Sequence, residues 1–146
     1  SNSRVYDWWN PYFVVSHLRT EHALADVELV YGERRIKKRA LIDTGASKSI
    51  ISKRLAIQLN AFIPLDEPYV LRTADKDGRL IISGFARLKV RFQGVEIPGG
   101  CTFEVAENMR EDVDVIIGRP EIDSWGIILT PEGARLRKVP VEFDII

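Results

Sequence analysis

The sequence predicts an all-β fold, built mainly from short strands with one or two short helices. Turn signals recur between apolar segments, and several of these segments alternate apolar and polar residues, as half-buried strands do. Helical spacing of apolar residues is confined to two short segments of the chain. At 146 residues, 45% of them hydrophobic and 29% charged, the chain is long enough for one domain with its own core.

Three hairpins are predicted from turn residues that lie between strand-like segments. They join 25–31 with 34–42, 69–74 with 79–83, and 126–130 with 134–139. The second turn contains Asp77-Gly78, and an Asp-Gly pair is a strong hairpin signal. Further strands are predicted at 86–92, 95–98, 102–107 and 112–118. In the last of these, Asp112 and Asp114 alternate with valines, so both are expected to face solvent.

Two short helices are predicted by capping signals. Ser52 is placed to cap a helix at 53–59, in which Leu55 and Leu59 have helical spacing. Pro120 suits the first turn of a second helix at 120–125, and Gly126 suits its end.

The first 24 residues differ in composition from the rest of the chain. They carry a cluster of aromatic side chains: Trp8, Trp9, Tyr12 and Phe13. We expect these side chains to cover the open end of a small β core. The predicted organisation is an N-terminal extension at 1–24, packed on or near that core, followed by one domain at 25–146.

Charge and hydropathy argue against several classes of partner. The chain has 21 basic and 21 acidic side chains, so no net field predicts binding to nucleic acid or to an anionic membrane. The basic run at 34–39 could contact nucleic acid, but charge that protects a strand edge from pairing is the favoured interpretation. Apolar runs are too short to span a bilayer and no secretory signal opens the sequence, which predicts a cytoplasmic protein.

The sequence predicts neither a metal nor an organic cofactor. His17 and His22 have no third ligand near them in the sequence, so both are interpreted as surface histidines. Cys101 is the only cysteine, which excludes an internal disulfide, and we expect it to be a buried structural thiol.

Asp43 brings a carboxylate to the end of an apolar segment. A carboxylate in such a position is costly to desolvate unless hydrogen bonds or function compensate. Thr44 follows with a hydroxyl, and Gly45 allows the backbone to turn tightly and direct its N–H at an anion. The pattern favours a catalytic carboxylate over an ordinary turn that ends a strand.

Residues 41–47, Leu-Ile-Asp-Thr-Gly-Ala-Ser, resemble the active-site loop of aspartic proteases. Residues 114–119 resemble the second signature of that family, an apolar strand that ends in glycine and leads into a short helix. In this chain the signature residues are Ile117, Gly118 and Arg119. The order and separation of the two segments resemble the retropepsins, the single-domain retroviral-type branch, over roughly residues 25–139. The resemblance implies a closed, barrel-like domain with aspartic endopeptidase activity.

Carboxylate-catalysed hydrolysis needs one ionised group to take a proton from water and one protonated group to polarise the carbonyl. The chain holds no second Asp-Thr/Ser-Gly, because Asp123-Ser124 is followed by Trp125. We therefore expect a two-fold symmetric homodimer in which each subunit contributes one Asp43. Two carboxyl groups held close together share a proton, an effect for which this protease family is the standard example.

The resemblance assigns a role to each residue of the loop. Thr44 would hydrogen-bond across the dimer axis, and Gly45 would donate to the carboxylate and contact the substrate backbone. Ala46 and Ser47 would lie beside the substrate. The hairpin at 69–83 would close over an extended peptide, with a tip formed by Thr73, Ala74, Asp75, Lys76, Asp77 and Gly78.

Three positions depart from the retroviral pattern. The hairpin tip is charged and has one glycine instead of several. Arg119 in relatives pairs with an acidic residue just after the catalytic loop, but Ser47 stands there, so a backbone carbonyl or an N-terminal acidic residue is the expected partner. Ala46 replaces a serine whose hydroxyl would favour the ionised carboxylate, which predicts a less acidic working range.

The function predicted from these residues is that of a homodimeric aspartic endopeptidase with a peptide or protein substrate. Two alternatives stay open at this level. The first alternative is a non-catalytic dimerisation or peptide-binding module with the same fold. The second is a protease that processes a retroelement polyprotein.

Overall fold

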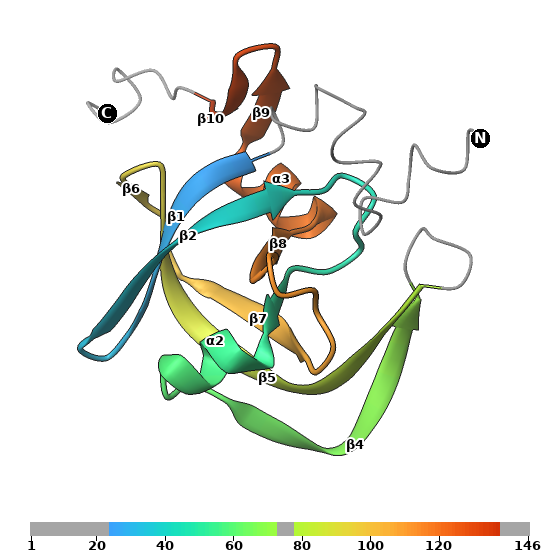
Figure 1. Cartoon of the computed structure of the whole chain (residues 1–146). Coiled ribbons are helices and arrows are strands. Elements are labelled where there is room, and N and C mark those ends of the chain that lie inside the picture. The colour runs from blue at the N-terminus through green and yellow to red at the C-terminus, as the bar shows by residue number, and fades with distance from the viewer. Residues whose placement is uncertain (1–23, 73–77, 138–146) are drawn as a thin grey trace.

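The computed structural model describes residues 24–72 and 78–137 (Figure 1). The elements are β1 (Leu24–Tyr31), β2 (Arg34–Ile42), β3 (Ile50–Ser52), α2 (Lys53–Gln58), β4 (Ile63–Arg72), β5 (Arg79–Phe92), β6 (Val95–Glu96), β7 (Cys101–Ala106), β8 (Val115–Ile117), α3 (Arg119–Trp125), β9 (Ile127–Thr130) and β10 (Gly133–Leu136). The expectations about Trp8, Trp9, Tyr12, Phe13, His17 and His22, and about residues 73–77, lie outside the described residues.

Six strands close into a barrel. Their order is β1-β2-β8-β3-β7-β5, and β5 pairs again with β1 through Val27–Phe92 and three further residue pairs. Strand β4 continues the sheet beyond β5, and Figure 1 shows these two strands reaching away from the barrel as a long hairpin. The predicted mainly β fold and the closed barrel are confirmed.

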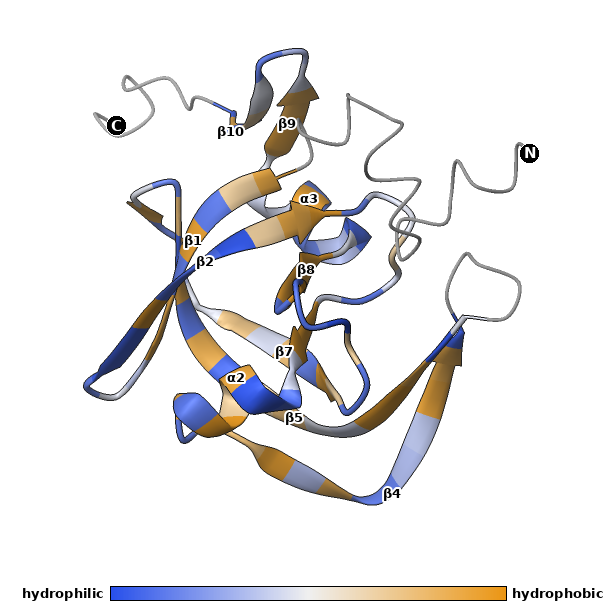
Figure 2. Cartoon of the chain, in the orientation of Figure 1, coloured by the Kyte–Doolittle hydropathy of each residue, from blue (hydrophilic) through white to orange (hydrophobic). Residues whose placement is uncertain are grey.

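All three residues of strand β8 are buried. It pairs in parallel with β2 through Leu41–Ile116 and Ile42–Ile117, and antiparallel with β3 on its other side. Alternate residues enter two different apolar clusters, because Ile117 packs inside the barrel and Ile116 packs against the β4–β5 hairpin. A strand covered on both faces reads as a continuous apolar run, which explains the sequence Val-Ile-Ile (Figure 2).

Strand β5 is 14 residues long and joins two strands that the sequence analysis separated, 79–83 and 86–92. Ser83 and Gly84 read as a break, but the chain continues through them with a shift of register against β7 between Ile82 and Gly84. A side chain at Gly84 would place its Cβ 2.3 Å from the carbonyl oxygen of Ile63. The glycine therefore allows β4 to cross closely and does not end the strand.

Most of the other predicted elements are confirmed with small changes of boundary, but β4 begins at Ile63, well before the predicted 69–74, and β3 was not predicted. The Ser52 hydroxyl accepts a hydrogen bond from the backbone N–H of Leu55 at 3.2 Å and so caps α2. Helix α3 ends at Gly126, whose φ of 71° is the left-handed conformation that glycine adopts easily. Strand β8 covers only Val115–Ile117 of the segment predicted at 112–118. None of the described helices is long and apolar enough to cross a membrane.

The expectation that Asp114 faces solvent is wrong. Its carboxylate accepts a hydrogen bond from the Ser52 hydroxyl at 2.6 Å and forms ion pairs with Arg54 at 2.7 Å and Lys38 at 3.0 Å. Residues 112–114 precede β8 and are not part of a strand, so their side chains do not alternate between two faces of a sheet. Asp112 is exposed, as expected.

This ion-pair cluster gives a prediction about acid stability. Burial by itself would raise the pKa of Asp114, but the hydrogen bonds from Ser52 and Lys38 and the charge of Arg54 together hold that pKa below its ordinary value. A lowered folded-state pKa stabilises the fold above the unfolded value, about 3.9, and the benefit is lost as pH falls through the folded value. We expect Asp114→Asn to lower the free energy of unfolding by about 1–2 kcal/mol at pH 7.

Urea unfolding followed at several pH values tests this expectation. The difference between wild type and Asp114→Asn must shrink as pH falls below about 4. An equal substitution at the exposed Asp66, which forms no ion pair within the described residues, is the control and should change little. If the difference in the free energy of unfolding between wild type and Asp114→Asn stayed constant down to pH 2, the electrostatic explanation would be contradicted.

Candidate active site

Asp43 follows the last residue of β2 and is half-buried. Its backbone N–H donates to the carbonyl oxygen of Ile117 at 2.9 Å, so the parallel pairing of β2 with β8 continues one residue into the loop. The carboxylate therefore stands where two neighbouring barrel strands end together. The loop that follows returns to the sheet at Ile50, the first residue of β3.

Backbone groups of the loop hold the Asp43 residue on two sides. The N–H of Gly45 donates to Oδ1 of the carboxylate at 2.9 Å, and the N–H of Ala46 donates to the Asp43 carbonyl at 3.1 Å. A Cβ on residue 45 would lie 3.3 Å from the same Oδ1, so glycine is the residue that leaves this approach uncrowded. Thr44, Gly45 and Ser47 are exposed, and Ala46 is half-buried.

Gly118 packs directly against the backbone of the Asp43 loop. A Cβ at this position would lie 2.4 Å from the carbonyl oxygen of Lys48 and 2.9 Å from that of Ala46. The next residue, Arg119, donates its backbone N–H to the Ala46 carbonyl at 2.8 Å. Gly118 is therefore required by space, since its φ of −94° is open to any residue.

Ser49 and Glu121 also hold the loop, and the sequence analysis missed both. The buried Ser49 hydroxyl accepts from the Gly118 N–H at 2.9 Å and donates to the Glu121 carboxylate. These bonds tie the loop to the N-terminal end of α3. The available sequence signal was a polar residue placed directly before the apolar Ile50-Ile51.

The expected partners of Arg119 are corrected. Its guanidinium pairs with Asp123 one turn later in α3, with 3.2 Å between Nε and Oδ2. Both side chains are more than half exposed, so this pair adds little to stability. In this chain the Ser49–Glu121 hydrogen bond joins the loop to the helix, and the arginine stays on the helix surface.

The β4–β5 hairpin packs over the sheet beside the loop. Its inward side chains Leu80 and Ile82 belong to an outer apolar cluster, which also contains Ile50, Ala106, Met109 and Ile116. Ala46 packs against this cluster. Of the proposed tip residues, Thr73, Ala74, Asp75, Lys76 and Asp77 lie outside the described residues, and Gly78 lies within them.

A polar contact connects the loop region, the hairpin and β7. The hydroxyl of Tyr69 in β4 donates to the carboxylate of Glu104 in β7. Burial, together with Glu104, raises the pKa of Tyr69 above its ordinary value, so the phenol stays protonated. The ammonium of Lys48 lies 5.8 Å from the centre of the Tyr69 ring, within the range of a cation–π contact.

Two other chemistries find little support in the described residues. Burial raises the pKa of the Cys101 thiol to about 12, which keeps it protonated and confirms that it is a buried structural thiol. Within 24–72 and 78–137, no group of three or more His, Cys, Asp or Glu residues is arranged to hold a metal ion. Asp43 is the one carboxylate in the loop at 43–49.

Comparison with known proteins identifies the fold. No protein-family model matches the chain, and no curated protein matches it in sequence. Among solved structures it is similar to the retroviral protease-like domain of Ddi1 from Leishmania major, with a TM-score of 0.54. The two are 21% identical, and the match covers 80% of this chain and 90% of that one. The chain has a retropepsin-like fold.

Proposed function

We propose that this protein is an aspartic endopeptidase that works as a homodimer, with one Asp43 from each subunit. The observation that carries the proposal is the Asp43 loop. The loop begins where the neighbouring strands β2 and β8 end. The Asp43 carboxylate accepts a hydrogen bond from the Gly45 N–H, and the adjacent Thr44 is exposed. An exposed hydroxyl beside a half-buried carboxylate suits a contact with a second copy of the loop.

The chemistry follows from pairing two such carboxyl groups. One ionised Asp43 takes a proton from a water molecule, which attacks the peptide carbonyl, while the protonated Asp43 of the partner donates to the carbonyl oxygen. The pair holds one proton because two adjacent negative charges are unfavourable. Gly45, Ala46 and Ser47 would contact the substrate, and the β4–β5 hairpin with its tip at 73–78 would act as a flap that excludes water.

Subunit mixing tests the proposal directly. If wild-type subunits exchange with an equal amount of Asp43→Asn subunits, about half of the wild-type subunits enter mixed dimers. A mixed dimer has one carboxylate, so peptide cleavage should fall to about half at constant wild-type concentration. Adding the same amount of Asp66→Asn protein, whose substitution is on an exposed position of β4, should raise cleavage instead.

Two results would contradict the proposal. Cleavage that does not change when the Asp43→Asn protein is added, with subunit exchange verified by sedimentation, would mean that each chain acts alone. Peptide binding without cleavage by wild type would support the alternative, a non-catalytic peptide-binding module.

Ala46 gives a separate prediction about pH. A serine at this position could donate a hydrogen bond to the ionised carboxylate and so lower the pKa of the Asp43 pair. We expect the acid limb of the pH–rate profile of Ala46→Ser to move to lower pH than that of wild type. Ala46→Val, which brings bulk without a hydroxyl, is the control. A wild-type profile that peaks in strong acid and does not move in Ala46→Ser would contradict this.

A further inference from the structure

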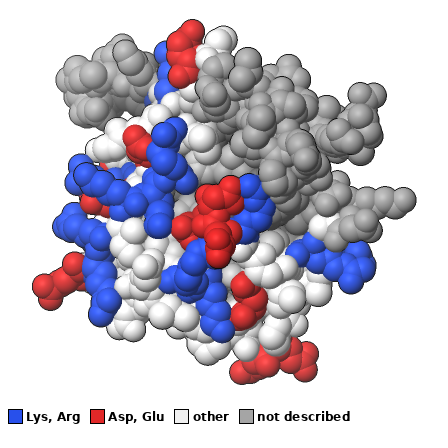
Figure 3. Space-filling model, in the orientation of Figure 1, with Lys and Arg blue, Asp and Glu red and all other residues white. Residues whose placement is uncertain are grey.

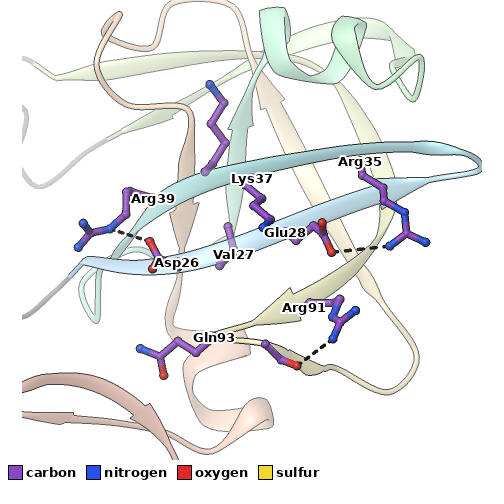
Figure 4. Close-up of a pocket in the computed structure, with 10 residues that line it drawn as sticks. Asp26, Val27, Glu28, Arg35, Lys37, Arg39, Arg91 and Gln93 are labelled. Carbon is purple, nitrogen blue, oxygen red and sulfur yellow. Dashed lines mark hydrogen bonds and ion pairs between the residues drawn. The ribbon is translucent and has the colours of Figure 1, made fainter.

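Two hollows lie next to each other on the outer surface of the barrel, and neither includes Asp43. The first, of about 940 Å³, lies over β1, β2 and the end of β5 (Figure 4). The second, of about 710 Å³, continues along β5 towards the turn after β1. Arg35 and Arg91 line both hollows, so the two form one elongated groove, here called the outer groove.

The outer groove is basic although the chain as a whole is neutral. Seven basic and three acidic side chains line it, whereas the full chain has 21 of each sign. Arg39 and Arg35 are paired with Asp26 and Glu28. Four other cations of the groove form no ion pair within the described residues: Lys37, Arg87, Lys89 and Arg91. Figure 3 shows Lys and Arg side chains gathered over the β1–β2 side of the molecule.

Strand register brings these cations to one face. Lys37 of β2 lies opposite Glu28 of β1, and Glu28 lies opposite Arg91 of β5. Two residues further along β1, Val30 lies opposite Lys89 of β5. Residues in register share a face of the sheet, so Lys37 and Arg91 lie on one face on either side of Glu28, with neighbouring strands about 4.8 Å apart.

Protection of a strand edge explains only part of this charge. Strand β2 pairs with β8 only at Leu41 and Ile42, so its residues 34–40 have one neighbouring strand and benefit from charged side chains. Strand β5 lies between β1 and β7 in the barrel. Its cations Arg87, Lys89 and Arg91 have no free edge to protect. Arg87 and Arg91 donate hydrogen bonds to the carbonyl oxygens of Gly99 and Gly94, which hold the side chains but leave their charge without an ion pair among the described residues.

We propose that the outer groove binds the phosphate backbone of single-stranded nucleic acid. An elongated surface on which seven basic side chains outnumber three acidic ones matches a chain of phosphates, and guanidinium groups bind phosphate through two parallel hydrogen bonds. Tyr31 lines the far end of the second hollow and is 42% exposed, which offers a surface on which a base can stack. The proposal departs from the expectation of no nucleic-acid partner, which rested on the net charge and on strand-edge protection by the basic run at 34–39.

Binding to a fluorescent 20-nucleotide oligo(dT) or oligo(U), followed by anisotropy, tests the proposal. We expect a dissociation constant on the order of 10 µM in 50 mM salt, typical of binding without sequence preference. Contact with three or four phosphates predicts a slope of about −2 to −3 in a plot of log K against log salt. Raising the salt from 50 to 200 mM should then weaken binding roughly 20- to 50-fold.

Variants locate the contact. Lys37→Gln combined with Arg91→Gln removes two cations in one row and should weaken binding about tenfold, with a salt slope smaller by about 1.4. The matched control is Arg72→Gln combined with Arg79→Gln, which neutralises another cross-strand pair of exposed arginines outside the groove. Circular dichroism melting curves establish that both proteins remain folded, and single substitutions replace the double one if it unfolds.

Each possible result either supports or contradicts binding of nucleic acid in the outer groove. Loss of affinity in the groove variant and not in the control supports the proposal. Equal loss in both variants, or no binding by wild type at 100 µM protein in 50 mM salt, overturns it. Tighter binding of an oligoglutamate peptide than of the oligonucleotide also overturns it, since the groove would then be a surface for an acidic protein segment.

Discussion

Asp43→Asn should reduce peptide cleavage about 10³-fold or more and leave the dimer intact. General acid–base catalysis by a positioned side chain contributes on the order of 10²–10⁴ to the rate, and this substitution removes both carboxylates of a homodimer. Asparagine keeps the shape of the side chain and an oxygen that accepts the Gly45 N–H. Cleavage of a peptide library, with sedimentation of the same samples, measures both effects.

Asp66→Asn is the matched control for this experiment. It makes the same chemical change at an exposed position of β4, and its carboxylate has no hydrogen-bond or ion-pair partner among the described residues. The expected activity is that of wild type. If the Asp43→Asn protein kept activity within tenfold of wild type, Asp43 would not be the catalytic carboxylate. If both variants lost activity equally, the effect would not belong to the Asp43 loop.

Gly118→Ala should destabilise the protein by about 3 kcal/mol and abolish cleavage. The added Cβ would overlap the carbonyl oxygens of Lys48 and Ala46, so the loop that carries Asp43 must move to admit it. Forcing an extra carbon into a closely packed site costs typically 1–3 kcal/mol, and backbone atoms yield less easily than side chains. Thermal denaturation should show a decrease of Tm of about 10 °C.

Gly126→Ala separates crowding from conformational strain. Gly126 has a positive φ of 71°, but an added Cβ would not be crowded, since its nearest neighbour, the Cβ of Arg137, would lie at an ordinary contact distance of 3.5 Å. This substitution should cost about 1–2 kcal/mol for the left-handed conformation and leave the Asp43 loop in place. Equal losses of activity in the two variants would contradict the view that Gly118 acts by giving the loop its space.

The sequence was informative wherever a local physical signal determined the structure. Ser52 caps α2 and Gly126 ends α3 as predicted, because each of these features depends on a few neighbouring residues. Asp43 could be singled out for the same reason, since a carboxylate after an apolar strand is unusual by itself.

Contacts between distant segments of the chain could not be predicted from such local signals. No local pattern pairs Ser49 with Glu121, 72 positions apart, or brings Asp114 to Lys38 and Arg54. The continuity of β5 through Gly84 depended on the close approach of Ile63, which is also a tertiary contact. In each case the decisive partner is supplied by another strand or helix.

The mainly β character of this protein, its turns and caps, and the position of the candidate carboxylate could be predicted from the amino-acid order, because these are properties of short segments. Which strands close the barrel, and which groups hold the Asp43 loop, depend on contacts between segments that are far apart in the chain. The same contacts set where charge accumulates. A chain with equal numbers of acidic and basic residues gathers a local excess of cations on the outer groove, because strand register aligns side chains of β2 and β5 on one face.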